Sequence, residues 1–438
     1  MLYYVDPFGC AKNQVDAENM MARLNGSGWS AAPDPADADL VIVNSCGFIE
    51  SAKQESINAV LGWRRLYPGK KILLAGCLAQ RYAKELAEAL PEADGFFGVD
   101  DISGIVQKAV SLTGSTAPDP RSPAPGSRPL LSLPGSAYVK ISEGCNNRCS
   151  FCAIPLIRGP LLCRAVPDIV DECKGLLSRG IKELCVIGQD IGSYRSGGAG
   201  LPELLSAIAE IPGDFWARLL YMHPDHFPLA VLDIMEKDAR FLPYFDIPFQ
   251  HGSPKILSAM NRRGGPENYI ALAETIRKRL PAAVIRTTFL AGFPGETEDD
   301  FALLLDFQEK LRPDWSGCFA FSREEGTPAY AMKAQIPKKT AAKRQRTIQE
   351  RQIQITEKNM ERFVGQNLDV LLEEKFSGNE TEGADIWLGR LYCHAPEVDG
   401  AAVITGIASE TEPKAGDVLP CRVTARRGLD LEVAQSRE

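Results

Sequence analysis

The sequence predicts a multidomain α/β chain with three parts: a parallel α/β domain, a partial six-stranded α/β barrel and a small antiparallel β-barrel. Three observations predict this. Short apolar runs alternate with amphipathic stretches over residues 1–110 and again over 137–335, which is typical of βαβ units and parallel sheets. A proline-rich stretch separates these two regions. After residue 365, short strand-like runs are divided by Gly and Pro, as in a small barrel.

Length and composition fit an ordinary globular protein. The chain has 438 residues, of which 45% are hydrophobic and 24% charged, so we expect roughly two to four domains. No run approaches the roughly 18 apolar residues of a membrane span, and the N-terminus does not read as a signal peptide. We therefore expect a cytoplasmic protein without membrane contact. The net charge of −8 argues against a dedicated nucleic-acid binder.

In the first predicted domain, residues 1–112, three cysteines follow buried strands. The runs LVIVNSC and KILLAGC end at Cys46 and Cys77, and Cys10 follows the first strand in the same way. Because parallel strands end at one sheet edge, where ligands bind in α/β folds, we expect the three thiols to meet there. Their spacings say nothing by themselves, so three structural core cysteines are an equal alternative at this point.

The next three segments complete the predicted organisation. Residues 113–136 contain six prolines and are expected to form a semi-extended linker. Residues 137–364 carry six strand candidates with intervening helices, which favours a partial α/β barrel. That domain ends in a long charged helix over 338–364. Residues 365–438 are expected to form the small antiparallel β-barrel.

A compact cysteine motif, SEGCNNRCSFC, carries the strongest chemical signal. Cys145, Cys149 and Cys152 are separated by three and then two residues just after a predicted strand. Three thiolates on one loop suit a 4Fe–4S cluster with one iron left open, which could chelate S-adenosylmethionine for radical chemistry. A structural zinc site would need four ligands, and no second C-x-x-C pair exists in the sequence. The other six cysteines are expected in the core: Cys163, Cys173, Cys185, Cys318, Cys393 and Cys421.

Several stretches resemble the radical S-adenosylmethionine methylthiotransferases. FGCAKNQVDAENM, VNSCGFIESAKQESI and AGCLAQRY resemble their N-terminal domain. KISEGCNNRCSFCAIPLIRG, YFDIPFQHGSPKILSAMNRRG and TTFLAGFPGETEDDF resemble their radical domain, and WLGRLYCHAPEVDGAAVITG resembles their OB-like TRAM barrel. The stretches A-P-E-V-D-G at 395–400 and I-S-E-G-C look similar to the RimO type, which modifies ribosomal protein.

The resemblance implies a specific reaction and cofactor set. It implies methylthiolation of the β-carbon of an aspartate in small-subunit ribosomal protein twelve, with S-adenosylmethionine and two 4Fe–4S clusters. One cluster would be held by Cys145, Cys149 and Cys152, and an auxiliary cluster by Cys10, Cys46 and Cys77. The enzyme would also need an external electron donor and a sulfur donor, and we expect no catalytic residue beyond the cluster ligands.

Four further residues are candidates for binding S-adenosylmethionine. Phe151 lies between two cluster ligands and is predicted to pack against the adenine, with core filling as the alternative. Gln189 ends a predicted strand at the mouth of the barrel. Gly292 and Glu296 belong to a strand–helix turn whose backbone amides could approach the nucleotide. An ordinary turn is equally compatible with these two residues.

Charge discriminates between a protein and an RNA substrate. Residues 365–438 carry seven Lys/Arg and fourteen Asp/Glu, a net charge of −7. An RNA-binding barrel should be basic because phosphate contacts supply most of the affinity, so this one favours a basic ribosomal protein. The alternative is a tRNA adenosine methylthiotransferase of the MiaB type, and we expect no dedicated tRNA binding. A radical methyltransferase and a non-catalytic iron–sulfur scaffold are further alternatives.

Overall fold

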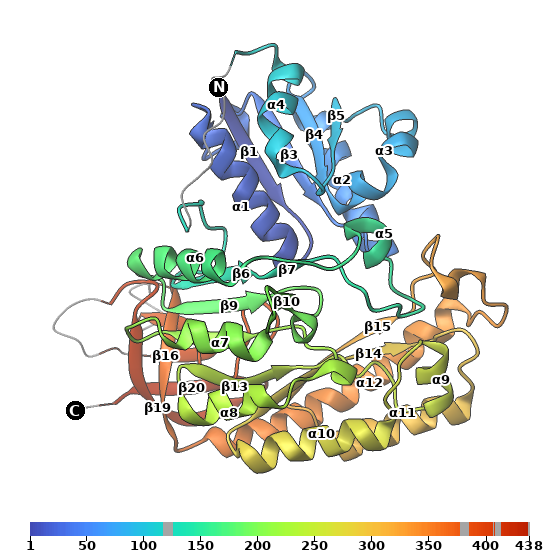
Figure 1. Ribbon diagram of the computed structural model, residues 1–438, viewed down its shortest axis with the longest axis vertical. Coiled ribbons are helices and arrows are strands. Elements are labelled where there is room, and N and C mark those ends of the chain that lie inside the picture. The colour runs from blue at the N-terminus through green and yellow to red at the C-terminus, as the bar shows by residue number, and fades with distance from the viewer. Residues whose placement is uncertain (117–125, 377–384, 406, 408–412, 437–438) are drawn as a thin grey trace.

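The computed structural model describes residues 1–116, 126–376, 385–405, 407 and 413–436. Within them the chain builds a five-stranded sheet, a six-stranded sheet and a closed five-stranded barrel, in that order along the sequence (Figure 1). Each lies in one of the three predicted domain ranges, except that the six-stranded sheet begins one residue early, at Ser136. The boundaries between the ranges stay a prediction.

The N-terminal sheet is parallel throughout, in the order β2–β1–β3–β4–β5. Alternate residues of β3 serve its two faces: Ile42 packs with α1 and α4, and Val43 packs with α2 and α3. Burial on both faces is the pattern of a parallel strand. The elements are β1 (Leu2–Pro7), α1 (Ala11–Gly26), β2 (Ser30–Ala31), β3 (Leu40–Ser45), α2 (Glu50–Leu66), β4 (Lys71–Gly76), α3 (Cys77–Ala89), β5 (Gly95–Phe97) and α4 (Ile105–Thr113).

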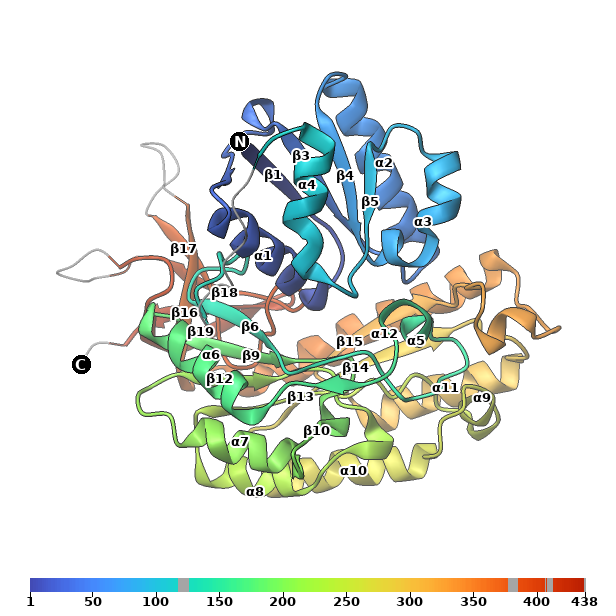
Figure 2. The same ribbon diagram turned by 45° about the horizontal axis from the view of Figure 1, so that its top comes forward.

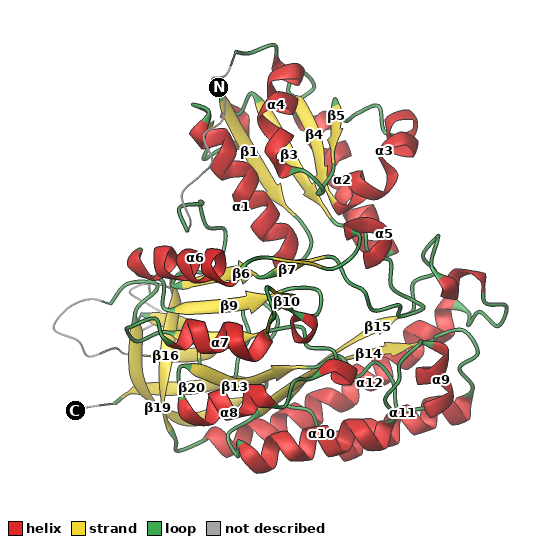
Figure 3. Cartoon of the chain, viewed as in Figure 1, coloured by secondary structure: helices red, strands yellow, loops and turns green. Residues whose placement is uncertain are grey.

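The central sheet confirms the predicted partial barrel of six parallel strands, in the order β6–β9–β12–β13–β14–β15. Helices cover its outer face (Figure 3). The strands are β6 (Ser136–Lys140), β9 (Glu183–Ile187), β12 (Trp216–Leu219), β13 (Phe241–Asp246), β14 (Val284–Ala291) and β15 (Trp315–Ala320). The helices are α5 (Ile154–Arg158), α6 (Val166–Ser178), α7 (Leu201–Ala209), α8 (Ala230–Lys237), α9 (Pro254–Ala259), α10 (Pro266–Arg279) and α11 (Glu298–Leu311). Two short antiparallel pairs lie in the connections: β7 (Ser142–Glu143) with β8 (Leu162–Cys163), and β10 (Arg195–Ser196) with β11 (Ala199–Gly200).

The predicted charged helix is α12, which spans Lys338–Met360 and packs along β15 and β14. One face is buried, with Ala341, Arg344, Ile348 and Gln352 at the spacing of successive helical turns. The opposite face carries most of the Lys and Arg side chains into solvent. Although α12 is long, neither it nor any other helix in the described ranges is apolar enough to cross a membrane.

The C-terminal domain is a closed barrel in the order β16–β17–β18–β20–β19. Four of its five strand pairings are antiparallel, as predicted, but β18 and β20 pair in parallel. The difference arises because β19 separates these two strands in sequence, so the chain returns to run in the same direction. The strands are β16 (Asn367–Phe376), β17 (Ile386–Arg390), β18 (Ala402–Thr405), β19 (Val418–Arg427) and β20 (Asp430–Gln435).

This closed barrel packs against the inner face of the partial barrel. In β9, Leu184 and Val186 face the outer helices, whereas Cys185 and Ile187 share a core with the C-terminal strands. The loop 395–400 is part of this contact, because Asp399 accepts hydrogen bonds from the Tyr244 hydroxyl (2.5 Å) and the Ala395 amide (2.8 Å). The C-terminal domain therefore covers the inner face of the central sheet and shares a hydrophobic core with it.

The predicted linker, 113–136, is more than a spacer. Its residues 117–125 lie outside the described residues, but Arg128 is buried in a contact between domains. Its Nε donates to Glu18 of α1 (2.7 Å), and its Nη1 and Nη2 donate to Glu172 of α6 and to the Tyr138 carbonyl. Arg128 thus anchors this part of the segment to both neighbouring domains, and its semi-extended linker character stays a prediction.

A buried ion-pair network joins the central sheet to the C-terminal barrel. Glu183, at the start of β9, accepts from Arg218 Nε of β12 (2.7 Å) and from Arg390 Nη2 of β17 (2.6 Å). The Ser136 hydroxyl donates to the same carboxylate (2.8 Å). Burial opposes the ionisation of Glu183, but Arg390 and Arg218 outweigh it and lower its pKa to about 2.

We predict that Glu183→Gln destabilises the protein at pH 7 by about 3–5 kcal/mol, because it leaves two buried guanidinium groups without their anion. The folded pKa of about 2 lies below the ordinary value of 4.5. Glu183 therefore stabilises the fold fully above pH 4.5, and this contribution is lost as the pH falls towards 2. Urea unfolding at several pH values should show that the difference in free energy of unfolding between wild type and variant decreases as the pH falls from 4.5 to 2.

The matched control is Glu85→Gln, since Glu85 is an exposed residue of α3. Its unfolding midpoint should match that of the wild type at every pH. If the difference in free energy of unfolding between wild type and Glu183→Gln stays constant down to pH 2, the stabilising role of the Glu183 carboxylate is contradicted.

Candidate functional site

The first cysteine triad lies in the loop between β7 and α5. Cys145, Cys149 and Cys152 are all partly exposed. Backbone hydrogen bonds fold the loop tightly: the Cys152 amide donates to the Cys149 carbonyl (3.0 Å), and the Cys145 amide donates to Gly159 beyond α5 (3.2 Å). The Asn147 amide points at the Cys145 sulfur (3.4 Å). One short loop therefore presents three thiols together.

The chemistry of this donor set fits a polynuclear iron–sulfur centre. Burial, together with a smaller contribution from charge on Cys149, raises the pKa of the Cys145 thiol to about 11 and that of Cys152 to about 12. Three thiolates so close together in poorly solvated surroundings require a compensating cation, and a metal centre deprotonates coordinating thiols. In the described ranges no three His, Cys, Asp or Glu side chains converge on a single ion. Separate irons of one cluster do not require such convergence.

The second triad lies where the sequence predicts it, at the carboxyl edge of the N-terminal sheet. Cys10 precedes α1, Cys46 follows β3, and Cys77 begins α3 directly after β4. Burial raises the pKa of Cys77 to about 12, and negative charge on Cys10 and Cys46 raises it as well. The three thiols therefore interact electrostatically at this edge of the sheet. Their role as auxiliary-cluster ligands stays a prediction.

Two glycines allow the loops of the second triad to approach each other. A Cβ on Gly47 would lie 2.6 Å from the Cys77 carbonyl oxygen. Gly76 has a φ of 95°, and a Cβ there would lie 2.6 Å from the Ser45 carbonyl oxygen. Any larger residue at either position would separate Cys46 from Cys77, so these glycines set the spacing of the triad.

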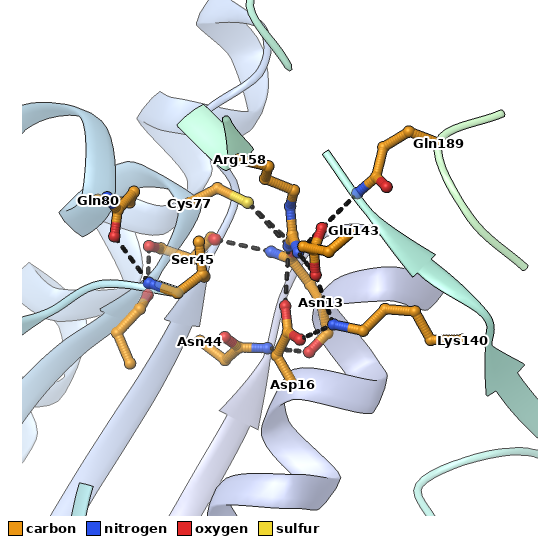
Figure 4. Close-up of polar contacts among 12 residues, drawn as sticks. Asn13, Asp16, Asn44, Ser45, Cys77, Gln80, Lys140, Glu143, Arg158 and Gln189 are labelled. Carbon is orange, nitrogen blue, oxygen red and sulfur yellow. Dashed lines mark hydrogen bonds and ion pairs between the residues drawn. The ribbon is translucent and has the colours of Figure 1, made fainter. Parts of the chain in front are cut away.

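A buried arginine, Arg158, lies between Cys77 of the second triad and the carboxylates of Asp16 and Glu143, as Figure 4 shows. Arg158 ends α5, six positions after Cys152, and its side chain is 1% exposed. Its Nη2 donates to the Cys77 sulfur (3.1 Å), to Asn13 Oδ1 (2.5 Å) and to Asp16 Oδ2 (2.8 Å). Its Nη1 donates to both carboxylate oxygens of Glu143 (2.9 Å). The guanidinium group therefore ties the first-triad loop to the second triad.

Glu143 is the centre of the polar network on the barrel side. Lys140 Nζ donates to it (2.6 Å) and also to Asp16 across the domain boundary. Burial opposes ionisation of Glu143, but Lys140 and Arg158 lower its pKa to about 2. Gln189, a predicted cofactor-binding residue, donates its Nε2 to Glu143 (2.6 Å). Its Oε1 is buried without a hydrogen-bond partner among the described residues. An S-adenosylmethionine contact at this oxygen stays a prediction.

The turn containing Gly292 and Glu296 is explained by contacts within the fold. Gly292 has a φ of 78°, and a Cβ there would lie 2.3 Å from the Ala341 Cβ of α12. Its amide donates to Glu296 Oε2 (2.7 Å) and is not available to a nucleotide. Arg344 of α12 binds the other carboxylate oxygen (2.8 Å). Both residues thus anchor α12, and the predicted cofactor contact has no support from this geometry.

Phe151 is partly buried and packs with the side chains around Phe293 and Met260. Core filling therefore accounts for it, and its predicted contact with adenine stays a prediction. The cysteines outside the triads are buried in the core as predicted, apart from the partly exposed Cys163.

The barrel contributes two residues that sequence reasoning missed, Tyr221 and His223. Tyr221 and Gln250 follow β12 and β13 with φ values of 68° and 72°, a conformation that non-glycine residues rarely adopt outside functional sites. His223 Nε2 lies 3.8 Å from the Cys149 sulfur. Burial lowers the pKa of His223 to about 3, so its ring is neutral. No motif in the sequence identifies Tyr221 or His223, since their positions depend on how strand β12 ends.

Comparison with known families divides the chain as the sheets do. Residues 2–98 match the model of Uncharacterized protein family UPF0004, residues 139–307 match the Radical SAM superfamily, and residues 364–434 match the TRAM domain. The first match contains the second triad, and the Radical SAM match contains the first.

Full-length relatives and solved structures agree with this division. A ribosomal protein uS12 methylthiotransferase RimO from Treponema denticola is 46% identical, covering 98% of this chain and 99% of the relative. The protein of the same name from Carboxydothermus hydrogenoformans is 40% identical over 99% of both chains. The radical S-adenosylmethionine methyltransferase TsrM from Kitasatospora setae, solved with cobalamin and a [4Fe-4S] cluster, has a TM-score of 0.55 at 16% identity. It covers 75% of this chain and 76% of its own, which shows a shared fold.

We predict that each triad holds about half of the iron of the reconstituted protein, since each would carry one four-iron cluster. The triple variant Cys10→Ala, Cys46→Ala, Cys77→Ala should lose about that half while keeping its fold. Iron analysis together with electron paramagnetic resonance of the reduced protein measures this loss.

Cys163→Ala is the control, because Cys163 is a partly exposed cysteine outside both triads and its variant should keep all the iron. Unchanged iron content in the triple variant would show that the N-terminal triad is structural.

Proposed function

The chain belongs to the family of ribosomal protein uS12 methylthiotransferases, and we propose that it transfers a methylthio group to uS12 at the interface of its two cysteine triads. It is a radical S-adenosylmethionine enzyme. The observation that carries the proposal is the 3.1 Å contact between Arg158 and Cys77, because it brings a radical-domain loop against the N-terminal triad.

We further propose that the acceptor is the β-carbon of an aspartate side chain. No general base of a protein can ionise an sp³ C–H bond of this kind, so the reaction needs a radical route. When bound, S-adenosylmethionine and iron–sulfur clusters supply hydrogen-atom abstraction, a methyl group and a site for sulfur. The overall change replaces one C–H bond of the acceptor by a C–S bond that carries the methyl group.

We assign one 4Fe–4S cluster to Cys145, Cys149 and Cys152 and an auxiliary cluster to Cys10, Cys46 and Cys77. The raised pKa values of Cys77 and Cys152 support this assignment, because these thiols remain protonated unless a metal takes them as thiolates. Cys10 differs, because its burial is outweighed by the positive charges of Lys12 and Arg158, which lower its pKa. The donor set is all sulfur in both places, which suits iron–sulfur chemistry better than a hard cation.

The polar residues around Arg158 would hold the two domains in a fixed geometry and exclude water from the reaction site. Asp16 lies on α1 and Glu143 on the barrel side, and both bind the same guanidinium group. Lys140 pairs with the same two carboxylates, so the contact between the domains is held by two cations and two anions. A fixed, closed geometry of this kind excludes water and stray hydrogen donors from a radical reaction.

A protein acceptor is favoured over tRNA. Each relative described above is a uS12 methylthiotransferase, and the C-terminal region 365–438 has a net charge of −7. That charge attracts a basic ribosomal protein and repels phosphates. We propose further that an external reductant and a sulfur donor act with the enzyme. Because its substrate belongs to the ribosomal small subunit, we place the activity in the cytoplasm.

The function is tested by anaerobic incubation of the reconstituted enzyme with reductant, S-adenosylmethionine, a sulfide source and purified small ribosomal subunits. We expect uS12 alone to gain one methylthio group in place of one hydrogen. Intact-mass analysis of the ribosomal proteins measures this gain, and fragmentation should place it on an aspartate.

The triple variant Cys145→Ala, Cys149→Ala, Cys152→Ala is the control and should leave uS12 unmodified. A parallel reaction with tRNA, followed by nucleoside analysis, separates the two substrate classes. Methylthioadenosine in tRNA with no change in uS12 would refute the proposal. A gain of a methyl group without sulfur would show a methyltransferase instead.

A further inference from the structure

Lys12 is a buried lysine at the interface that pairs with no carboxylate among the described residues. It lies on α1, two positions after Cys10, and is 7% exposed. Among the described residues, its ammonium group makes no hydrogen bond and no ion pair. The ammonium group contacts the ring of Tyr221, whose centroid lies 3.1 Å from Nζ. A cation in this position is stabilised by the aromatic face but has lost most of its hydration.

Three other buried cations near the interface pair with carboxylates, whereas Lys12 pairs with none in the described ranges. Arg158 and Lys140 each bind both Asp16 and Glu143. Arg128 likewise binds two carboxylates. Because buried charges in proteins are normally paired, the missing partner of Lys12 is expected to come from a bound molecule.

The nearby acidic groups cannot serve as that partner because other groups already bind them. Asp246 and Glu143 both interact electrostatically with Lys12 but lie beyond ion-pair distance of its nitrogen. Asp246 binds Arg286 (3.2 Å) and accepts from the Tyr221 amide (3.3 Å). Glu143 is surrounded by Lys140, Arg158 and Gln189. A further anion at Lys12 would therefore be the first to bind it directly.

The surroundings of Lys12 indicate what the anion is. One neighbour is Cys10 of the N-terminal triad, whose thiol interacts with the ammonium group. The other is Tyr221, which follows β12 and reaches Lys12 from a left-handed backbone conformation. Lys12 thus lies between the triad proposed to supply sulfur and the domain proposed to generate the radical. A carboxylate bound there would be held where the carbon–sulfur bond has to form.

We propose that Lys12 binds the side-chain carboxylate of the acceptor aspartate and thereby selects aspartate over asparagine. This inference rests on the proposed function. In aspartate the β-carbon is bonded directly to the carboxylate carbon. Fixing the carboxylate on Lys12 therefore holds the β-carbon next to the Cys10 side of the interface. An asparagine amide has the same shape but no charge, so it cannot neutralise Lys12.

The test compares the binding of two substrates to the holoenzyme without reductant, so that no turnover occurs. The substrates are uS12 and uS12 in which the acceptor aspartate is replaced by asparagine. Calorimetry should show that the wild-type enzyme binds the aspartate form about tenfold more tightly, as for a hydrogen bond between charged groups. Lys12→Met should bind both forms equally, and Lys12→Arg should restore much of the preference.

Lys174→Met is the matched control, since Lys174 lies on the surface of α6 with 57% of its side chain exposed. It should keep the full preference. Lys12→Met that still prefers aspartate tenfold would overturn the proposal. The proposal would also be overturned if Lys12→Met bound S-adenosylmethionine more weakly but kept the preference for aspartate. Lys12 would then bind the carboxylate of S-adenosylmethionine and not that of the acceptor. If Lys12→Met and Lys12→Gln both lose the same amount of iron, Lys12 serves to maintain the N-terminal triad. That result would also overturn the proposal.

These outcomes are separate from a failure of the proposed function. If the wild-type holoenzyme neither binds uS12 nor modifies it in the mass assay, the assignment of the substrate is wrong. If the wild type modifies uS12 and Lys12→Met retains the preference, only the role of Lys12 is wrong.

Discussion

The guanidinium group of Arg158 is the interaction on which the site depends. It is buried, and its charge is balanced by Asp16 from one domain and Glu143 from the other. Removing one member of such a buried network leaves an uncompensated charge, which typically costs about 3–5 kcal/mol. The two domains are therefore favoured in the arrangement that places Cys77 against Arg158. Figure 2 shows the N-terminal sheet and its helices beside the central domain in this arrangement. The distance between the triads follows from this pairing.

The topology of both sheets explains why the triads can meet at all. Parallel strands end at one edge, and in the N-terminal sheet that edge carries Cys46 after β3 and Cys77 after β4. The central sheet also places its strand ends at one edge, where Tyr221 and Gln250 adopt left-handed conformations. Two binding edges of the kind found in α/β folds thus contribute to one interface. Helix α1 contributes to both edges. It follows β1 of the N-terminal sheet, and its residues Asp16 and Lys12 contact residues of the central domain.

Local patterns in the sequence predicted what depends on neighbours along the chain. The spacing of Cys145, Cys149 and Cys152 identified the first triad, and buried apolar runs predicted the strands that position the second. Contacts between segments that lie far apart in the sequence could not be predicted in this way. Arg128 and Arg158 have partners more than 100 positions away, and the turn at Gly292 is shaped by α12 rather than by a nucleotide. The parallel pairing of β18 with β20 likewise depends on how the barrel closes.

The distribution of charge connects the fold to the choice of substrate. The C-terminal barrel contributes Asp399 and Arg390 to the interior, where they pair with Tyr244 and Glu183 of the central domain. The motif 395–400 therefore serves the packing of the barrel. The net charge of −7 over residues 365–438 is what we propose attracts a basic protein. Long-range attraction of this kind raises the rate of encounter but does not select one side chain. Selection requires a desolvated contact, and the unpaired ammonium group of Lys12 between the two domains is a group that can provide it.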